Sequence, residues 1–268
     1  MTGFSLQLED IRFAYPGSTG GRRGDCPSNR PGDRLSGETG GSTRRKQAGE
    51  TCGSPSCSPS GSLSGRLEPF SLAFERFSPG ACTALLGPNG SGKTTVGKLA
   101  AGILKPDSGR VLFGGQDIAG WELGRIGKQV GYLFQDPSRQ IFAPHPLEEI
   151  AFPLELRGVP KQDAGEKARR LLAEFELEDI AGSTTYTLSR GEKQRLAIAA
   201  VMACEPRYFI LDEPTTGLDK RRRDMLAGTL RRLMEQEVGI LLFTHDRSFA
   251  EGLYADIRLI EGGRLLDA

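Results

Sequence analysis

The sequence has no apolar run that approaches the ~18 residues needed to span a bilayer. Its opening, MTGFSLQLED, contains neither a basic start nor the apolar core of a secretory signal. Lys and Arg total 35 against 34 for Asp and Glu, so no overall charge of one sign indicates nucleic acid or membrane lipid as a partner. We therefore expect a cytosolic chain whose function depends on local sites.

A disulfide framework is also missing. The five cysteines are odd in number and irregularly spaced, and a reducing compartment keeps such residues as thiols. Cys52 and Cys57 are close enough in sequence to be metal ligands, but no histidine accompanies them, so we expect ordinary thiols.

One segment lacks aromatic residues, Ile, Val and Met altogether. Residues 17–66 consist mainly of Gly, Ser, Pro, Thr and Arg, which bury too little apolar surface to offset the entropy of ordering them. We expect a disordered surface insertion. Its eight basic and four acidic side chains are compatible with a solvated loop or with transient contact to anionic lipid or RNA.

On both sides of this insertion the apolar residues alternate as they do in strands, over Phe4–Phe13 and Leu67–Phe77. The insertion thus replaces a hairpin turn. Beyond it, short apolar strands alternate with helices, which predicts an α/β core with a parallel sheet. The expected elements are Ala81–Leu86, Lys93–Leu104, Tyr208–Leu211, Asp219–Gln236 and Gly239–Phe243.

Between the two halves of this core, residues of about 136–195 have helical spacing and no strand-like run. Leu147, Ile150 and Ala151 form one apolar group, and Ala168 begins another with Leu171, Leu172 and Phe175. A helical subdomain inserted into the α/β core explains this pattern.

The segment GPNGSGKTT, Gly87–Thr95, carries the clearest chemistry. It follows an apolar strand, opens a helix and has the spacing of a phosphate-binding loop. Glycines let successive backbone N–H groups point at phosphate oxygens, and the helix N-terminus adds partial positive charge. We expect Lys93 to reach the β- and γ-phosphates and the Thr94 hydroxyl to bind Mg²⁺.

A second segment, YFILDEP, places two carboxylates after a buried strand, at the edge where α/β sheets bind ligands. Asp212 is suited to orient the Mg²⁺ water shell and Glu213 to polarise the attacking water. An Asp-Glu pair alone is equally compatible with surface charge. Together with the phosphate loop it indicates nucleotide hydrolysis.

The segment LSRGEKQR, Leu188–Arg195, lies just upstream of the Asp-Glu strand and resembles the signature of ABC ATPases. We call it the signature segment. The resemblance covers the whole chain except the insertion. It implies one domain over residues 1–268 with the phosphate-loop NTPase fold of ABC ATPase type: a mixed sheet core, an antiparallel β subdomain and an inserted helical subdomain.

Further positions resemble that family one by one. Gln135 matches the glutamine that reaches Mg²⁺, Asp219 an aspartate that contacts the partner subunit, and His245 a histidine at the γ-phosphate. Tyr15 matches the aromatic residue that stacks on adenine. The resemblance thus implies Glu213, His245 and Gln135 as catalytic residues, and Thr94, Gln135 and Asp212 as metal ligands. The expected nucleotide contacts are Tyr15, Gly87, Pro88, Asn89, Gly90, Ser91, Gly92, Lys93, Thr94, Thr95, Ser189, Gly191, Glu192 and Asp219.

The segment Phe134–Phe152 resembles, more narrowly, the ATPase subunits of energy-coupling-factor transporters. Those subunits drive uptake of vitamins, cobalt or nickel through separate membrane proteins. There the segment lines a groove that holds a helix of the membrane partner, which makes Gln140, Ile141, Phe142 and Phe152 contact candidates. The same apolar residues are equally compatible with internal packing.

The resemblance implies an ATP- and Mg²⁺-dependent ATPase at the cytoplasmic face of a membrane. Its site is completed by a second ATPase subunit, identical or related, because the signature segment faces away from its own phosphate loop. A soluble ABC ATPase acting on nucleic acid or the ribosome is the alternative, but neither coiled-coil arms nor a second cassette is found. The sequence does not identify the cargo. Arg190 stands where the family usually has Gly, which leaves its effect on activity open.

Overall fold

The computed structural model describes residues 5–15, 70–261 and 264–267. Contacts divide the chain into two units, one of residues 1–14 and 68–268 and the other of residues 15–67. All described residues except Tyr15 belong to the first unit. The insertion predicted over residues 17–66 lies outside the described residues.

The smaller sheet of the described residues is antiparallel, with the strand order β2-β1-β4-β5. Leu6 of β1 pairs with Phe77 of β2 on one side and with Phe113 of β4 on the other. The pairing of β1 with β2 confirms that the strands flanking the insertion are neighbours. The four strands are β1 (Leu6–Phe13), β2 (Phe70–Phe77), β4 (Ser108–Phe113) and β5 (Gln116–Asp117).

The larger sheet has the order β10-β9-β3-β8-β7-β6 within the described chain. All neighbours are parallel except β10, which is antiparallel to β9, so the predicted mixed sheet core is confirmed. Its strands are β3 (Cys82–Leu86), β6 (Val130–Leu133), β7 (Tyr208–Asp212), β8 (Gly239–Thr244), β9 (Asp256–Glu261) and β10 (Arg264–Asp267).

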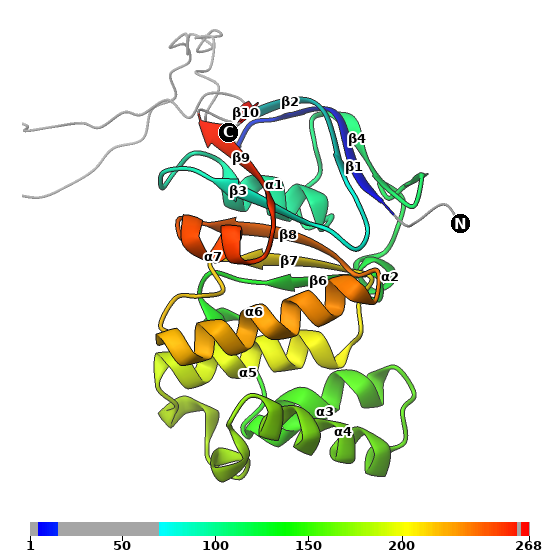
Figure 1. Ribbon diagram of the computed structural model, residues 1–268. Coiled ribbons are helices and arrows are strands. Elements are labelled where there is room, and N and C mark those ends of the chain that lie inside the picture. Colours follow the sequence, from blue (N-terminus) through cyan, green and yellow to red (C-terminus); the bar gives the residue numbers. More distant parts are fainter. Residues whose placement is uncertain (1–4, 16–69, 262–263, 268) are drawn as a thin grey trace, which may run out of the picture. The chain divides into compact units, whose positions relative to one another are not determined.

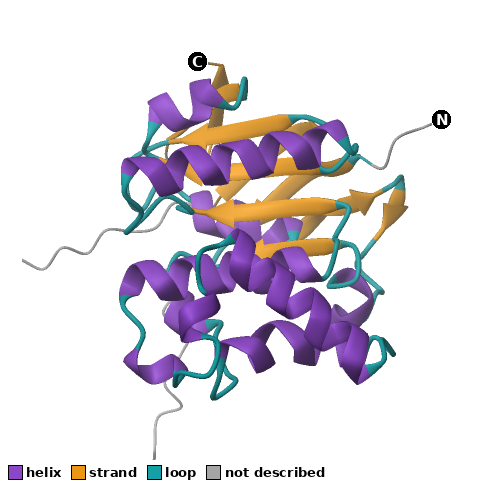
Figure 2. Ribbon diagram, turned by 60° about the horizontal axis from the view of Figure 1, so that its bottom comes forward, coloured by secondary structure: helices purple, strands orange, loops and turns teal. Residues whose placement is uncertain are grey.

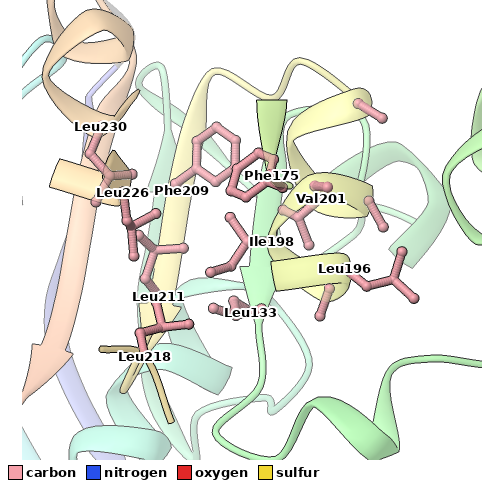
Figure 3. Close-up of a cluster of buried hydrophobic side chains, with 14 of the residues drawn as sticks. Leu133, Phe175, Leu196, Ile198, Val201, Phe209, Leu211, Leu218, Leu226 and Leu230 are labelled. Carbon is pink, nitrogen blue, oxygen red and sulfur yellow. The ribbon is translucent and has the colours of Figure 1, made fainter. Parts of the chain in front are cut away.

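The central strands are apolar along their whole length because both of their faces are covered. In β7, Phe209 and Leu211 face one buried cluster and Ile210 faces the other. Figure 3 shows Phe209 and Leu211 beside Ile198 of α5 (Arg190–Ala203) and Leu226 of α6 (Lys220–Glu235). The second cluster contains the buried apolar side chains of β1 and of α1 (Lys93–Ala100).

Helices cover the larger sheet, as Figure 2 shows. In Figure 1, α5 and α6 run beside the sheet, and α3 and α4 lie on the side of α5 away from it. The helices, with η for 3₁₀ turns, are α1 (Lys93–Ala100), α2 (Leu123–Ile126), η1 (Pro137–Arg139), α3 (Pro146–Leu156), α4 (Lys161–Glu174), η2 (Glu178–Ile180), η3 (Thr185–Thr187), α5 (Arg190–Ala203), α6 (Lys220–Glu235) and α7 (Arg247–Gly252). Among them, none is long and apolar enough to cross a bilayer. The boundaries of a helical subdomain over about 136–195 remain a prediction.

Two arginines tie the helical segment to the rest of the unit. The guanidinium of Arg157 donates to the carbonyls of Cys204 at 2.5 Å and Gly127 at 2.8 Å. Buried Arg195 of α5 donates to the carbonyl of Phe175, at the end of α4, at 2.9 Å. Burial lowers the pKa of Arg195 from its usual value. Both side chains satisfy carbonyls at helix ends that have no partner within their helix.

The helix predicted over Lys93–Leu104 is shorter than expected, because α1 ends at Ala100. Gly102 has a φ of 66°, and the N–H of Ile103 donates to the carbonyl of Lys98. This is a Schellman ending, which a left-handed glycine permits at no steric cost. The apolar residues after Gly102 continue the helical spacing of the sequence, which extended the predicted helix too far, but the helix ends before this glycine.

Gly97 is the point of closest approach of α1 to the sheet. A Cβ added there would lie 2.6 Å from Cε2 of Phe243 and 3.1 Å from the ring of Tyr132. Alanine is favoured in a helix by about 1 kcal/mol, whereas overpacking of a core costs about 1–3 kcal/mol.

We therefore expect Gly97→Ala to lower the free energy of unfolding by roughly 1–2 kcal/mol, measured by chemical denaturation. Gly165→Ala in α4 is the matched control, because the only neighbour of its added Cβ is the flexible end of Arg169 at 3.8 Å. The control should gain about 0.5–1 kcal/mol. Equal gains in both variants would contradict the packing given for α1.

Candidate functional site

The phosphate-loop sequence connects β3 to α1 through a tightly packed turn. Gly90 and Gly92 have φ values of 83° and 106°, which side chains rarely adopt. A Cβ on Gly87 would lie 2.3 Å from the carbonyl oxygen of Ile260 in β9. These glycines allow the backbone to turn sharply at the carboxyl edge of the sheet and to present the first turn of α1.

Lys93 is buried at the centre of this turn. Its ammonium donates to the carbonyl oxygens of Gly87 at 2.6 Å and Pro88 at 2.9 Å. The loop therefore wraps around the cation that we predict to contact the β- and γ-phosphates. The hydroxyl of Ser91 is buried and has no hydrogen-bond partner in the described chain. A phosphate oxygen fits this orphaned donor and the first-turn N–H groups.

The Asp-Glu pair follows β7 and lies beside the loop. The hydroxyl of Thr94 donates to Oδ2 of Asp212 at 2.8 Å. Burial raises the pKa of Asp212, and the bond from Thr94 opposes that rise. A hydroxyl and a carboxylate are the hard oxygen ligands that Mg²⁺ prefers, so these residues fit the predicted metal site. Gln135, the third predicted ligand, is exposed and lines the same cavity as Thr94 and Asp212.

Glu213 is buried and has a φ of 53°, an uncommon conformation for a residue with a side chain. Its N–H donates to the carbonyl of Phe243 in β8 at 2.8 Å, which holds the backbone in place. Nδ1 of His245 lies 2.9 Å from Oε2 of Glu213. The hydroxyl of Thr244 donates to the same oxygen at 3.4 Å. The structure thus brings two of the three predicted catalytic side chains into direct contact.

The signature segment forms the start of α5, and Ser189 is its N-cap. The Ser189 hydroxyl and N–H both donate to Oε2 of Glu192 at 2.7 Å, and the Glu192 N–H donates back to the hydroxyl at 3.3 Å. These bonds from Ser189 lower the pKa of Glu192. This capping box aligns the first turn of the helix and satisfies two of its free N–H groups. Ser189 therefore has a structural role within its own chain besides any contact with nucleotide.

Gly191 is required by close packing of α5 on the loop before α6. A Cβ on Gly191 would lie 2.9 Å from the carbonyl oxygen of Gly217. Nearby, the amide of fully buried Gln194 donates to the carbonyl of Pro214 at 3.2 Å. The head of α5 is thus held against the loop that follows Glu213.

A cavity of about 640 Å³ connects these parts of the chain. It is lined by Thr94, Lys98, Phe134, Gln135, Asp136, Ser138, Arg139, Leu188, Arg190, Lys193 and Asp212. The resemblance implies a signature segment that faces away from its own phosphate loop. Leu188 and Arg190 line the cavity, whereas Ser189 and Gly191 do not. The orientation of the signature segment relative to the phosphate loop stays a prediction.

Asp219 and Tyr15 are two further predicted nucleotide contacts. Asp219 is the N-cap of α6: its carboxylate accepts from the N–H of Arg222 at 2.9 Å, which lowers the pKa of Asp219. The Asp219 carboxylate also forms an ion pair with the guanidinium of Arg222, at a distance of 2.6 Å. Tyr15 belongs to the second unit, so its stacking on adenine stays a prediction.

The four residues proposed to contact a membrane protein divide into two pairs. Phe142 and Phe152 pack edge to face, with ring centroids 5.4 Å apart, and line a groove of about 870 Å³ between α3 and α4. Gln140 does not line it, because its amide binds the backbone of Tyr132 and Phe134. Ile141 packs on the buried cluster instead. Contact of these four residues with a membrane protein stays a prediction.

Thr244 and Gln194 are contacts that the sequence did not reveal. Thr244 directly precedes the predicted His245 and ends an apolar strand, which is a signal for a site residue. Gln194 is a polar residue inside an apolar helical stretch, which usually requires a buried partner. Neither signal identifies the partner.

Comparison with known proteins places this geometry in context. A family profile described as ABC transporter matches residues 72–216. A predicted ABC transporter ATP-binding protein of Methanosarcina acetivorans is 39% identical over 75% of this chain, which spans 33% of that relative. One of Pyrococcus abyssi is 37% identical over 69% of this chain and 72% of its own length.

Two solved structures share the fold. cbiO1 from Clostridium perfringens, described as part of the ABC transporter complex cbiONQ, has a TM-score of 0.69 at 24% identity, over 98% of this chain and 87% of its own. The ATP-binding cassette MJ0796, a dimer in a post-hydrolysis state bound to ADP and Pi, has a TM-score of 0.67 at 25% identity, over 74% of this chain and 90% of its own. The predicted ABC ATPase fold, with its mixed sheet and helices, is confirmed.

Proposed function

Because this chain belongs to the ABC transporter family of ATPases, we propose that it is the ATP-hydrolysing subunit of an importer, of the energy-coupling-factor type, that takes up a vitamin or a transition-metal ion. The observation that carries the proposal is the contact between two segments 118 residues apart. Thr94, at the head of the phosphate-loop helix, binds Asp212 beside the buried Glu213.

Binding of the triphosphate is assigned to the phosphate loop and Lys93. An ammonium among phosphate oxygens makes charge-assisted hydrogen bonds, about twice as strong as neutral ones. Thr94, Asp212 and Gln135 would hold Mg²⁺, which would supply positive charge beside the phosphates. The backbone N–H groups of the segment from Gly90 to Thr95 would donate to the phosphate oxygens.

Activation of water is assigned to Glu213. Its carboxylate is fixed by the backbone bond to Phe243 and by its contact with His245. Because the carboxylate is already held in position, no free energy is needed to reorient it when it accepts a proton from the attacking water. We assign the contact with the γ-phosphate to His245, whose side chain is 76% exposed. Catalysis is thus mainly positioning and charge stabilisation.

The proposed active unit contains two ATPase chains. Ser189 and Gly191 do not line the cavity beside their own phosphate loop, so they are available to a nucleotide bound by another copy. Asp219 is also exposed, two residues after Gly217, against which Gly191 packs. The dimeric state of the related cassette MJ0796 supports this arrangement.

Coupling to membrane subunits is assigned to the groove with Phe142 and Phe152, which are 60% and 43% exposed. An apolar groove with two partly exposed aromatic rings suits the apolar face of a partner helix. The membership of cbiO1 in a transporter complex supports a membrane partner of this kind. In this assembly the chain is peripheral, at the cytoplasmic face of the membrane.

We expect Glu213→Gln to keep ATP affinity and to lower steady-state turnover by about a hundredfold or more, the scale of losing a general base. Glu237→Gln is the matched control, because Glu237 also has a positive φ, of 65°, but is exposed. Its turnover should equal that of the wild type. Near-normal hydrolysis by Glu213→Gln would remove Glu213 from the proposed role.

Lys93→Ala should weaken ATP binding by about tenfold or more, because it deletes a charged donor to phosphate. Equilibrium titration with ATP measures this directly. Lys128→Ala, at an exposed lysine outside the site, should leave the affinity unchanged. An unaltered affinity in Lys93→Ala would count against the phosphate-loop assignment.

A further inference from the structure

The cavity beside the phosphate loop has an unusual charge. Four cationic side chains line it, from three elements: Lys98 of α1, Arg139 of η1, and Arg190 and Lys193 of α5. Two carboxylates, Asp136 and Asp212, also line it. The cavity therefore carries a net positive charge that the proposed roles of its residues leave unexplained.

The two carboxylates offset only part of the charge of the four cations. Asp136 lies 3.7 Å from Arg139 and accepts from the N–H of Ser138. Asp212 accepts from Thr94 and is predicted to bind Mg²⁺. Arg190 forms no ion pair with any described residue, whereas Lys98 is close enough to Asp212 to interact electrostatically with its carboxylate.

Lys193 donates only to a neutral group, the carbonyl of Tyr186, at 3.4 Å. Arg190 and Lys193 are three residues apart on α5 and therefore lie on one face of the helix. Both stand in its first turn, where the dipole of a 14-residue helix adds positive charge. Buried Asp212 lines the same cavity and is bound to Thr94 at the head of the phosphate-loop helix.

We propose that this cavity binds the inorganic phosphate that hydrolysis releases, through Arg190 and Lys193 of the same chain. The proposal rests on the proposed ATPase function. An orthophosphate leaving the loop at Thr94 and Asp212 enters a space lined by these two cations. The planar guanidinium of Arg190 suits two oxygens of one phosphate, and Lys193 adds a second charge.

The position of Arg190 makes the site particular to this chain. Its Cγ lies 3.8 Å from the place of a Cβ on Gly217, so the side chain runs past that loop toward the cavity. A glycine at 190, usual in ABC ATPases, would supply no charge there. The consequence is that this chain retains its phosphate product longer and is more sensitive to inhibition by it.

The test is equilibrium dialysis of radiolabelled inorganic phosphate against the full chain saturated with Mg·ADP, at low ionic strength. Sedimentation confirms that the sample is monomeric, so that Arg190 acts within its own chain. The wild type should bind phosphate, and Arg190→Ala and Lys193→Ala should each weaken binding by about tenfold. Arg190→Lys keeps the charge and should lose less than Arg190→Ala.

Arg170→Ala is the matched control, because Arg170 is exposed on α4 and does not line the cavity. Its phosphate affinity should equal that of the wild type. Equal affinity in wild type and Arg190→Ala would overturn the proposal, because phosphate held only at the phosphate loop does not depend on Arg190. Absence of phosphate binding by the wild type at millimolar concentration would overturn it too.

ADP and ATP affinities, measured on the same samples, separate the two proposals. Intact nucleotide binding together with either negative result overturns the phosphate site alone. Absence of nucleotide binding by the wild type overturns the proposed ATPase function, and the phosphate site with it.

Discussion

The hydrogen bond from Thr94 to Asp212 is the contact on which the proposed site depends, because it joins the phosphate loop to the end of β7. It exists only because β3 and β7 are both parallel to β8, which lies between them, so that their carboxyl ends share one edge. Gly87 and Gly97 make this arrangement possible by letting the loop and α1 approach the sheet. Glu213, the next residue after Asp212, lies at the same edge of the sheet. The carboxylates proposed to bind metal and to activate water are thus adjacent to the loop proposed to bind phosphate.

Much of this arrangement is predictable from sequence because it is encoded locally. The apolar runs before Gly87 and Asp212 indicate buried strands, and the glycines and Lys93 have a fixed spacing. The order of strands and helices predicts the sheet. The confirmed fold and family follow from these short segments, and the roles of the individual site residues remain predictions.

Other features depend on contacts that no local pattern specifies. Gln140 lies in a segment that resembles a partner-binding surface, yet its amide is bound to the backbone of β6 and the residue after it. Arg190 and Lys193 line one cavity with Lys98 and Arg139 only because folding brings segments distant in sequence to that cavity. The sequence permits two interpretations of Ser189, because a serine that caps a helix and a serine that binds phosphate occur in the same sequence pattern. For such residues the side-chain partner, and not the residue type, decides the function.

The central claim is that one ATP site needs two chains: Lys93 of one and Ser189 of another. Mixing two inactive variants, Lys93→Ala and Ser189→Ala, tests it most directly, with ATPase activity as the measurement. Each variant alone should be nearly inactive, and an equal mixture should regain activity, because about a quarter of all sites in random dimers combine an intact Lys93 with an intact Ser189. A mixture no more active than its separate components, or full activity of Ser189→Ala alone, would contradict the account.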